Sequence, residues 1–143
     1  MTDARQLAGR WRLVSWTAVR DDGHVGHPFG ERPEGVAVFG EDGWAAVQIA
    51  ATERPETSGR DPFGAPESEQ ARAFATYLAY AARYEVHEDR VELHVELSLH
   101  PPWVGTTQVR RYVFDEGELV LRPPVVETPG GRVAHELRWR RES

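Results

Sequence analysis

RVELHVELSLHPPWVGTTQVRRYVF, residues 90–114, contains two strand-like segments joined by a proline-rich loop. From residue 91 to residue 99 the odd positions are apolar and the even positions are polar or charged. This period-two alternation predicts a β-strand with one apolar and one polar face. Pro101 and Pro102 cannot donate hydrogen bonds to a sheet, and the β-rich run at residues 106–114 predicts a second strand. The segment is therefore a long β-hairpin, which needs further strands to be stable in water.

Six further strands are predicted elsewhere in the chain. Alternating or β-rich runs bounded by turn residues place them at residues 10–20, 35–39, 44–50, 80–86, 118–122 and 133–140. Tight turns are expected between neighbours, including a three-residue turn at residues 115–117 with Gly117 in the left-handed conformation. Most successive strands are thus close in sequence and can pair as antiparallel neighbours.

Eight antiparallel strands joined mainly to their sequence neighbours favour closure into a barrel. Closure pairs every strand on both sides and leaves no edge. We therefore predict an all-β fold, an eight-stranded antiparallel up-and-down barrel formed by a single domain, residues 1–143, with an open meander or a sandwich as the alternative. The interior of such a barrel is either filled by side chains or holds one small ligand.

One helix interrupts the strand pattern, between the third and fourth strands. Apolar residues recur at helical spacing within residues 67–78, which predicts an amphipathic helix laid against the mouth or wall of the barrel. The run at residues 51–67 is rich in proline and glycine and lacks periodicity, which predicts a long surface loop. A short helical turn capped by Thr2 or Asp3 is expected at residues 3–8.

The overall composition limits the function classes. A formal net charge of −6 argues against nucleic acid or an anionic membrane surface as a partner, because both require clustered positive charge. The chain has neither an apolar run long enough to span a membrane nor an apolar N-terminal segment, so we expect a cytoplasmic protein. The sequence does not indicate an oligomeric state.

Missing residue types exclude several kinds of catalytic site. Cysteine and lysine are both absent, which excludes disulfides, thiolate nucleophiles and lysine Schiff bases. The chain has no glycine-rich phosphate-binding loop of the usual spacing, so we expect no cofactor. The pairs His24/His27 and His94/His100 each lack a third ligand at a recognised spacing, so we expect no metal site.

Five segments together resemble the bacterial and fungal lipocalin-like domain family, a group of calycin-type barrels. GRWRLVS at residues 9–15 is similar to the GxW opening of lipocalins, and HVELSLHPPWVGTTQVR at residues 94–110 is the most specific match. The others are VFGEDGW at residues 38–44, AYAARYEV at residues 79–86 and WRR at residues 139–141. One mild departure is Ala82, where a glycine is expected.

The resemblance covers almost the whole chain and implies an eight-stranded calycin barrel. Members of the family are similar to small-ligand binders, and some are cofactor-free cyclases or isomerases in natural-product pathways, so the resemblance fixes fold better than function. It also implies that Trp11 packs at the closed end of the barrel beneath an arginine of the last strand, Arg138 or Arg140. Glu136, Arg138 and Arg140 otherwise form a solvated face.

The turn at residues 87–90 decides which row of the central hairpin faces the barrel interior. A two- or four-residue turn pairs Val86 with Val91 and gives an apolar lumen. A three-residue turn pairs Tyr84 with His94 and turns the polar row inward. The next strand then adds Gln108, Arg110 and Tyr112. We favour the apolar lumen, because the charged face of an antiparallel sheet normally faces solvent.

Each register gives its own candidate site. With an apolar lumen, the expected ligand-binding residues are Trp44, Tyr84, Leu93, Val95, Leu97, Trp103 and Tyr112. Trp103 is included because it lies in a loop and is expected to close the barrel mouth. With a polar lumen, His94 beside Glu96 is the candidate general base, and Arg110 would stabilise an enolate or oxyanion.

Three functions remain open at this point. The first, which we favour, is binding of a small hydrophobic molecule such as a polyketide-like or terpenoid metabolite. The second is a cofactor-independent cyclase or isomerase that uses acid–base residues in the lumen. The third is a structural partner protein with a filled core. An apolar cavity larger than about 300 Å³ favours the first, a buried histidine–carboxylate pair the second and a filled core the third.

Overall fold

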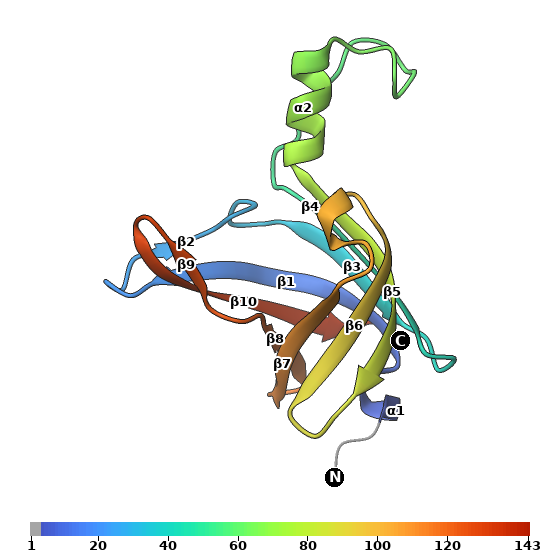
Figure 1. Ribbon diagram of the computed structural model, residues 1–143, viewed down its shortest axis with the longest axis vertical. Coiled ribbons are helices and arrows are strands. Elements are labelled where there is room, and N and C mark those ends of the chain that lie inside the picture. Colours follow the sequence, from blue (N-terminus) through green and yellow to red (C-terminus); the bar gives the residue numbers. More distant parts are fainter. Residues whose placement is uncertain (1–3) are drawn as a thin grey trace.

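The computed structural model describes residues 4–143 and shows a closed antiparallel barrel (Figure 1). Its eight strands are β1 (Gly9–Arg20), β3 (Glu34–Phe39), β4 (Trp44–Ala50), β5 (Tyr77–Val86), β6 (Arg90–Ser98), β7 (Thr107–Asp115), β8 (Glu118–Arg122) and β10 (Gly131–Arg141). Each pairs with the next in this order, and pairing of β10 with β1 closes the cylinder. Two short strands, β2 (Val25–Gly26) and β9 (Val126–Thr128), pair with β1 and β10. The predicted eight-stranded barrel is confirmed.

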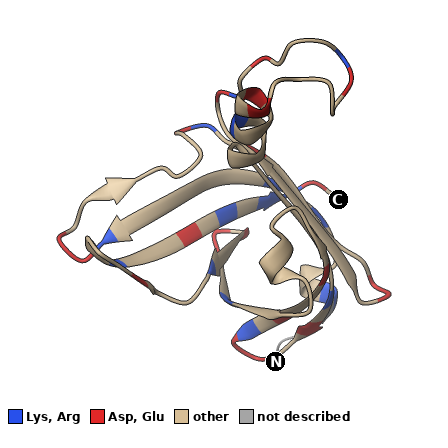
Figure 2. Cartoon of the chain, turned by 45° about the horizontal axis from the view of Figure 1, so that its top comes forward, with Lys and Arg blue, Asp and Glu red and all other residues tan. Residues whose placement is uncertain are grey.

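The outer surface carries charges of both signs, interspersed over the strands and turns (Figure 2). On β10, Arg138 pairs with Asp115 at 2.9 Å, with Glu118 at 3.2 Å and with Glu136 at 3.3 Å. These ion pairs form the solvated face that was expected for the last strand. Among residues 4–143, no helix is both long and apolar enough to cross a membrane.

α1 (Ala4–Leu7) lies at the end of the barrel near both chain termini (Figure 1), and it plugs this end together with Trp11. Leu7 and Trp11 are 0% and 1% exposed, and the indole N–H of Trp11 donates to the Leu7 carbonyl at 2.8 Å. The guanidinium carbon of Arg141 lies 4.3 Å from the centroid of the Trp11 ring. The same guanidinium donates to the carbonyls of Gln6 and Ala8, so it ties the last strand to the N-terminal helix.

The arginine over Trp11 is therefore Arg141, and the expectation of Arg138 or Arg140 is wrong. Trp11 pairs directly with Arg141 across β1 and β10, and directly paired residues share a face of the sheet. Arg138 and Arg140 lie on the opposite, outer face, where both pair with Glu118.

The long helix differs from its prediction in length and in placement. α2 (Glu67–Ala75) lies between β4 and β5 as expected, but it ends before Tyr77, which pairs with Ala50 and begins β5. It projects beyond the strands (Figure 1) and has no buried residue, and Phe74 is 48% exposed. Its other apolar residues are alanines, which offer too little apolar surface to hold it against the barrel.

The hairpin between β7 and β8 turns on two residues rather than the expected three. Asp115 pairs directly with Glu118, and the intervening Glu116 and Gly117 both have positive φ, 52° and 83°. Two left-handed residues in a two-residue loop make a type I′ turn, whose twist matches that of the flanking strands. Glu116 therefore adopts a conformation that favours asparagine or glycine.

We expect Arg141→Met to lower the free energy of unfolding by about 1–2 kcal/mol, because the variant loses the stacked cation and the donors to two carbonyls. Urea denaturation followed by tryptophan fluorescence measures the change. Arg140→Met, on the outer face of the same strand, is the matched control and should change stability by less than about 0.5 kcal/mol. Equal losses in the two variants would contradict the assigned role of Arg141.

Glu116→Asn should raise the free energy of unfolding by about 0.5–1 kcal/mol, because asparagine tolerates the left-handed conformation of the type I′ turn better than glutamate. Glu41→Asn makes the same charge change in the turn between β3 and β4, where the residue does not have positive φ. Thermal unfolding of both variants distinguishes the backbone effect from the charge effect. A gain in Glu41→Asn as large as that in Glu116→Asn would refute the explanation.

Candidate ligand-binding cavity

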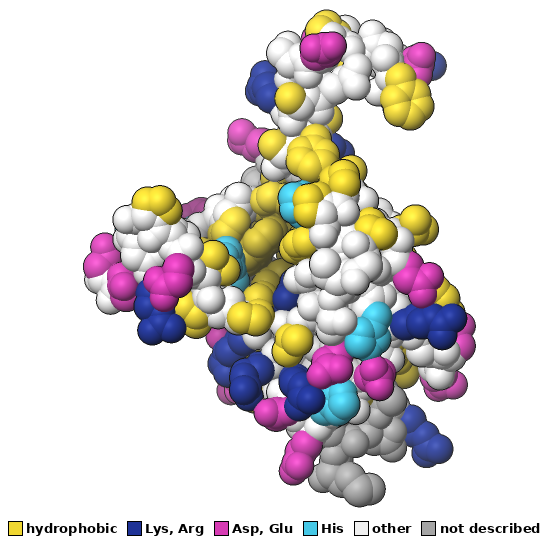
Figure 3. Space-filling view, viewed as in Figure 1, with side chains coloured by type: hydrophobic (Ala, Val, Ile, Leu, Met, Phe, Trp, Pro, Cys, Tyr) yellow, Lys and Arg dark blue, Asp and Glu magenta, His cyan; other side chains and the backbone are white. Residues whose placement is uncertain are grey.

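A cavity of about 690 Å³ occupies the barrel interior and opens to solvent. Its walls are mostly apolar and come from strands around the cylinder, including Phe39, Val47, Ile49, Leu93, Leu121 and Leu137. Figure 3 shows the opening as a hollow surrounded by hydrophobic side chains. The volume is in the range of sites that hold small molecules, so the interior is not a filled core.

The turn after β5 selects the apolar register for β6. Val86 pairs with Val91 and Tyr84 with Leu93, as expected for a two- or four-residue turn. Val91, Leu93 and Val95 are 0%, 1% and 3% exposed. The row of β6 that faces the barrel interior is therefore the apolar one over this part of the strand.

A β-bulge ends this register at Glu96. Ala82 pairs with Val95, but Ala81 pairs with Leu97, so Glu96 is an extra residue on β6. The bulge turns Leu97 outward, where it is 71% exposed. Leu97 therefore lies outside the lumen, which corrects its placement in the apolar row.

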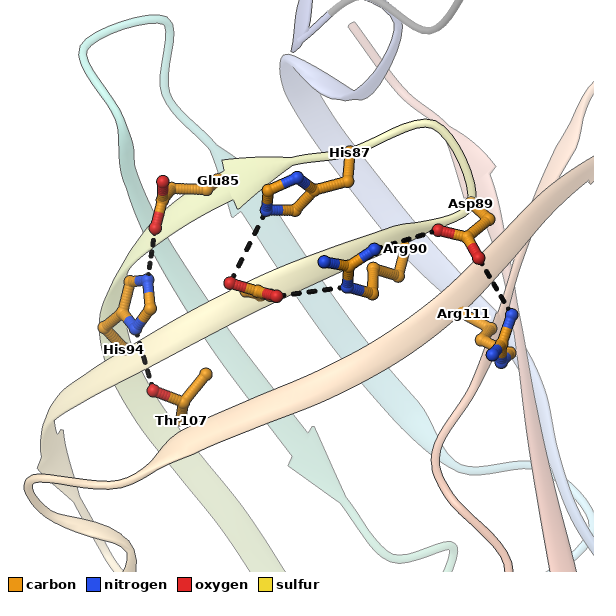
Figure 4. Close-up of polar contacts among 8 residues, drawn as sticks. Glu85, His87, Asp89, Arg90, His94, Thr107 and Arg111 are labelled. Atoms are coloured by element: carbon orange, nitrogen blue, oxygen red, sulfur yellow. Dashed lines mark hydrogen bonds and ion pairs between the residues drawn. The ribbon is translucent and has the colours of Figure 1, made fainter.

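His94 and Glu96 point away from the lumen. His94 Nε2 lies 2.6 Å from Glu85 Oε2, and His94 Nδ1 lies 2.9 Å from the Thr107 hydroxyl (Figure 4). Arg83 donates to the Glu96 carboxylate at 3.1 Å. The two residues belong to the exposed outer face of the sheet and do not reach a molecule held in the cavity.

The same outer face groups three side chains of the types that bind metal ions. Glu85, Glu92 and His94 have ligand atoms within 4.8 Å of one another. Arg90 donates to Glu92 at 3.0 Å, and this hydrogen bond lowers the pKa of the Glu92 carboxyl (Figure 4). The Glu85 carboxylate pairs with the His94 ring. The arrangement is that of a solvated ion-pair network, and we assign it no metal.

Strand β7 supplies a polar part of the lumen. Leu93 pairs with Gln108 and Val91 with Arg110, so these β7 side chains share the inner face with the apolar row of β6. A polar lumen was expected to bring Arg110 and His94 together. The observed register separates them, because His94 pairs with Thr107 rather than with a residue of the Arg110 row.

Four titratable side chains line the cavity: Tyr80, Arg110, Glu127 and His135. Burial raises the pKa of the Tyr80 phenol, lowers the pKa of His135 and lowers the pKa of Arg110. The positive charge of Arg110 offsets part of the rise in the pKa of Tyr80 and adds to the fall in the pKa of His135. The Trp103 ring adjoins two of them, with its centroid 5.9 Å from the Arg110 guanidinium carbon and 5.5 Å from the Tyr80 ring centroid.

His135 has a defined hydrogen-bonding state. The indole N–H of Trp16 donates to His135 Nδ1 at 3.0 Å. Because an indole nitrogen is only a donor, Nδ1 must be the unprotonated nitrogen, and the neutral ring carries its proton on Nε2. A doubly protonated imidazolium has no acceptor nitrogen, so the Trp16 contact and the lowered pKa both favour the neutral ring.

Residues 8–142 match the family model described as a lipocalin-like domain. The chain belongs to the lipocalin-like domain family. One curated relative of this lipocalin-like domain is the 4'-hydroxy-3'-methoxypropiophenone carrier protein of Aspergillus oryzae. The two sequences are 31% identical over 83 residues, which are 52% of this chain and 74% of the relative.

The expected ligand-binding residues divide between the cavity, its supporting shell and the outer face of this lipocalin-like barrel. Leu93 and Trp103 line the cavity. Tyr84 and Tyr112 are 8% and 7% exposed, and their hydroxyls donate to the carbonyls of Gly40 at 2.6 Å and His87 at 2.8 Å, so they brace turns. Val95 is buried in the core but is not among the lining residues. Trp44 stands on the outer face, 40% exposed, with the Arg83 guanidinium carbon 5.2 Å from its ring centroid.

Trp16, Tyr80 and His135 are cavity residues that the sequence analysis did not select. For His135 a signal was present, because it alternates with Leu137 and Trp139, whose apolar side chains predict an inward row. Tyr80 had the same kind of signal, because it alternates on β5 with Leu78, Ala82 and Tyr84, and the extra residue of the bulge lies on β6.

We expect His135→Gln to reduce the pH dependence of stability in this lipocalin-like domain. The folded-state pKa of His135 lies below 6.5, so the unfolded chain takes up a proton at higher pH than the folded chain. The stabilisation by neutral His135 is therefore fully present above about pH 6.5 and is lost as the pH falls below it. Tyr80, Arg110 and Glu127, which share the cavity with His135, are unchanged in the variant.

Urea denaturation of both proteins between about pH 7.5 and pH 5 checks this expectation, because glutamine keeps an acceptor for Trp16 but does not titrate. The stability advantage of the natural protein over the variant should shrink as the pH falls. An advantage that stays constant over the range would show that His135 does not titrate in this way.

Proposed function

We propose that this protein binds and carries a small, mostly hydrophobic molecule in its barrel cavity. The observation that carries the proposal is the cavity of about 690 Å³, which has mostly apolar walls and an opening to solvent (Figure 3). Transfer of an apolar molecule from water into such a site is favourable. Leu93 and Trp103 are the proposed wall contacts that the sequence already indicated, and Trp16 and Trp139 lie in the same lining.

The relative supports one class of molecule over the other. The Aspergillus oryzae protein is named as a carrier of a propiophenone, which is an aromatic ketone. For the present chain this favours a polyketide-like aromatic metabolite over a terpenoid.

The two other functions lose their supporting features. The cyclase or isomerase hypothesis named His94 and Glu96 as the acid–base residues of the lumen, and both lie on the outer face. The hypothesis of a structural partner needs a filled core, and the cavity exceeds the roughly 300 Å³ at which small-molecule sites begin. A cytoplasmic location and the lack of a nucleic-acid partner stay predictions from the sequence and its net charge of −6.

The proposal is tested with N-phenyl-1-naphthylamine, a neutral hydrophobic dye whose fluorescence rises in apolar surroundings. We expect saturable binding to the natural protein. Leu78→Trp places a larger side chain in the cavity lining and should weaken binding by about tenfold or more, because the enlarged side chain competes for the same volume. Leu97→Trp adds the same side chain on the outer face of the next strand and is the matched control.

The control should bind the dye as the natural protein does. Lack of saturable binding to the natural protein would refute the proposal. Equal binding by all three proteins would also refute it, because the dye would then occupy a site outside the cavity. Near-ultraviolet circular dichroism of both variants shows whether the barrel is retained.

A further inference from the structure

Arg110 places a positive charge inside a cavity whose walls are mostly apolar. It lies on the inner face of β7 opposite Val91, and it is one of the lining residues. Its Nη1 donates to the neighbouring Val109 carbonyl at 3.0 Å, and its guanidinium carbon lies 5.9 Å from the Trp103 ring centroid. A guanidinium stays protonated in proteins even where burial lowers its pKa. The cavity therefore contains a permanent cation.

This cation has no carboxylate partner within 4.0 Å among residues 4–143. On the same strand, the outward-facing Arg111 pairs with Asp89 at 3.0 Å. Glu127, which also lines the cavity, pairs with Arg132 at 3.1 Å. Arg110 is half-buried, and partial burial of a charge without an ionic partner has a cost that is relieved when an opposite charge enters. An anionic group on a bound molecule would relieve it at Arg110.

The neighbours of Arg110 offer further hydrogen-bond donors. The raised pKa of Tyr80 keeps its phenol protonated at neutral pH. His135 accepts from Trp16 through Nδ1, which leaves Nε2–H as a donor. Gln108, which pairs with Leu93 on the row of Arg110, directs its amide N–H to Thr106 at 2.9 Å. The polar part of the cavity is thus rich in donors around a cation, and it is complementary to an oxygen anion.

We propose that the molecule held in this cavity carries an acidic oxygen, as a carboxylate, phenolate or enolate, that pairs with the Arg110 guanidinium while its apolar part contacts the remaining walls. The inference rests on the proposed binding function and adds the chemical class of the ligand. A ligand with a single anionic group on an otherwise apolar skeleton matches both parts of the lining.

Displacement of N-phenyl-1-naphthylamine by decanoate and by decan-1-ol at neutral pH tests the inference. The two probes share the same chain and differ in the charge of the head group. The alcohol is the more hydrophobic of the two, so apolar burial alone would favour it. We expect the natural protein to bind decanoate about tenfold more tightly than decanol, because a charge-assisted hydrogen bond is stronger than a neutral one.

Arg110→Met keeps the apolar stem and removes the charge. It should abolish the preference for decanoate over decanol, because both head groups then meet an uncharged side chain. Arg110→Lys should keep part of the preference, since it keeps the charge but not the planar fork. Arg111→Met, on the outer face of the same strand, is the matched control and should keep the full preference.

The outcomes separate the two proposals. If decanol binds the natural protein as tightly as decanoate, the anion inference is overturned and the binding function stands; this comparison needs no variant and does not depend on the folding of Arg110→Met. If Arg111→Met loses the preference as fully as Arg110→Met, the inference is also overturned, because general surface charge would explain it. If neither the dye nor either chain compound binds, the binding function itself fails and the inference fails with it.

Discussion

The seam between β1 and β10 holds the sheet closed as a cylinder. The two strands pair from Trp11 and Arg141 at one end to Arg20 and Val133 at the other, with one irregularity between Leu13 and Ser15. This pairing joins the first and last long strands, so it removes the open edges that an unclosed sheet would have. The same register places Arg141 over Trp11 at the plugged end.

Within the cylinder, the neighbouring strands β6 and β7 contribute different kinds of lining. The inner row of β6 is apolar up to Val95, whereas the adjacent inner row of β7 contributes Gln108 and Arg110. The division follows from antiparallel pairing, which sets Leu93 directly beside Gln108 and Val91 beside Arg110. A molecule in the cavity would meet a hydrocarbon surface on one side and a group of hydrogen-bond donors on the other. Such a division orients a ligand as well as binding it.

Local alternation in the sequence predicted the strands and the closed fold, because each strand has one face toward the core and one toward water. The apolar register of β6 was favoured for the same reason. The placement of Leu97 could not be predicted in this way, because an extra residue at Glu96 reverses the faces and has no mark in the sequence. The arginine above Trp11 depended on pairing across the seam, 130 residues apart in sequence. The end of α2 was set by the pairing of Tyr77 with Ala50, which competes with helix formation and is decided by tertiary contacts.

The segment that contains α2 joins the barrel at a single point. Ala50 and Tyr77 are paired neighbours, and the amide of Ala51 donates to the carbonyl of Thr76 at 3.0 Å. Residues 53–76 thus connect β4 to β5 in the way that a hairpin turn connects two paired strands. The entropic cost of closing such a connection grows only slowly with its length. Insertions, deletions or a proteolytic cut within residues 53–76 would leave the backbone hydrogen bonds between the barrel strands in place. The length and sequence of this segment can therefore change during evolution without altering the cavity.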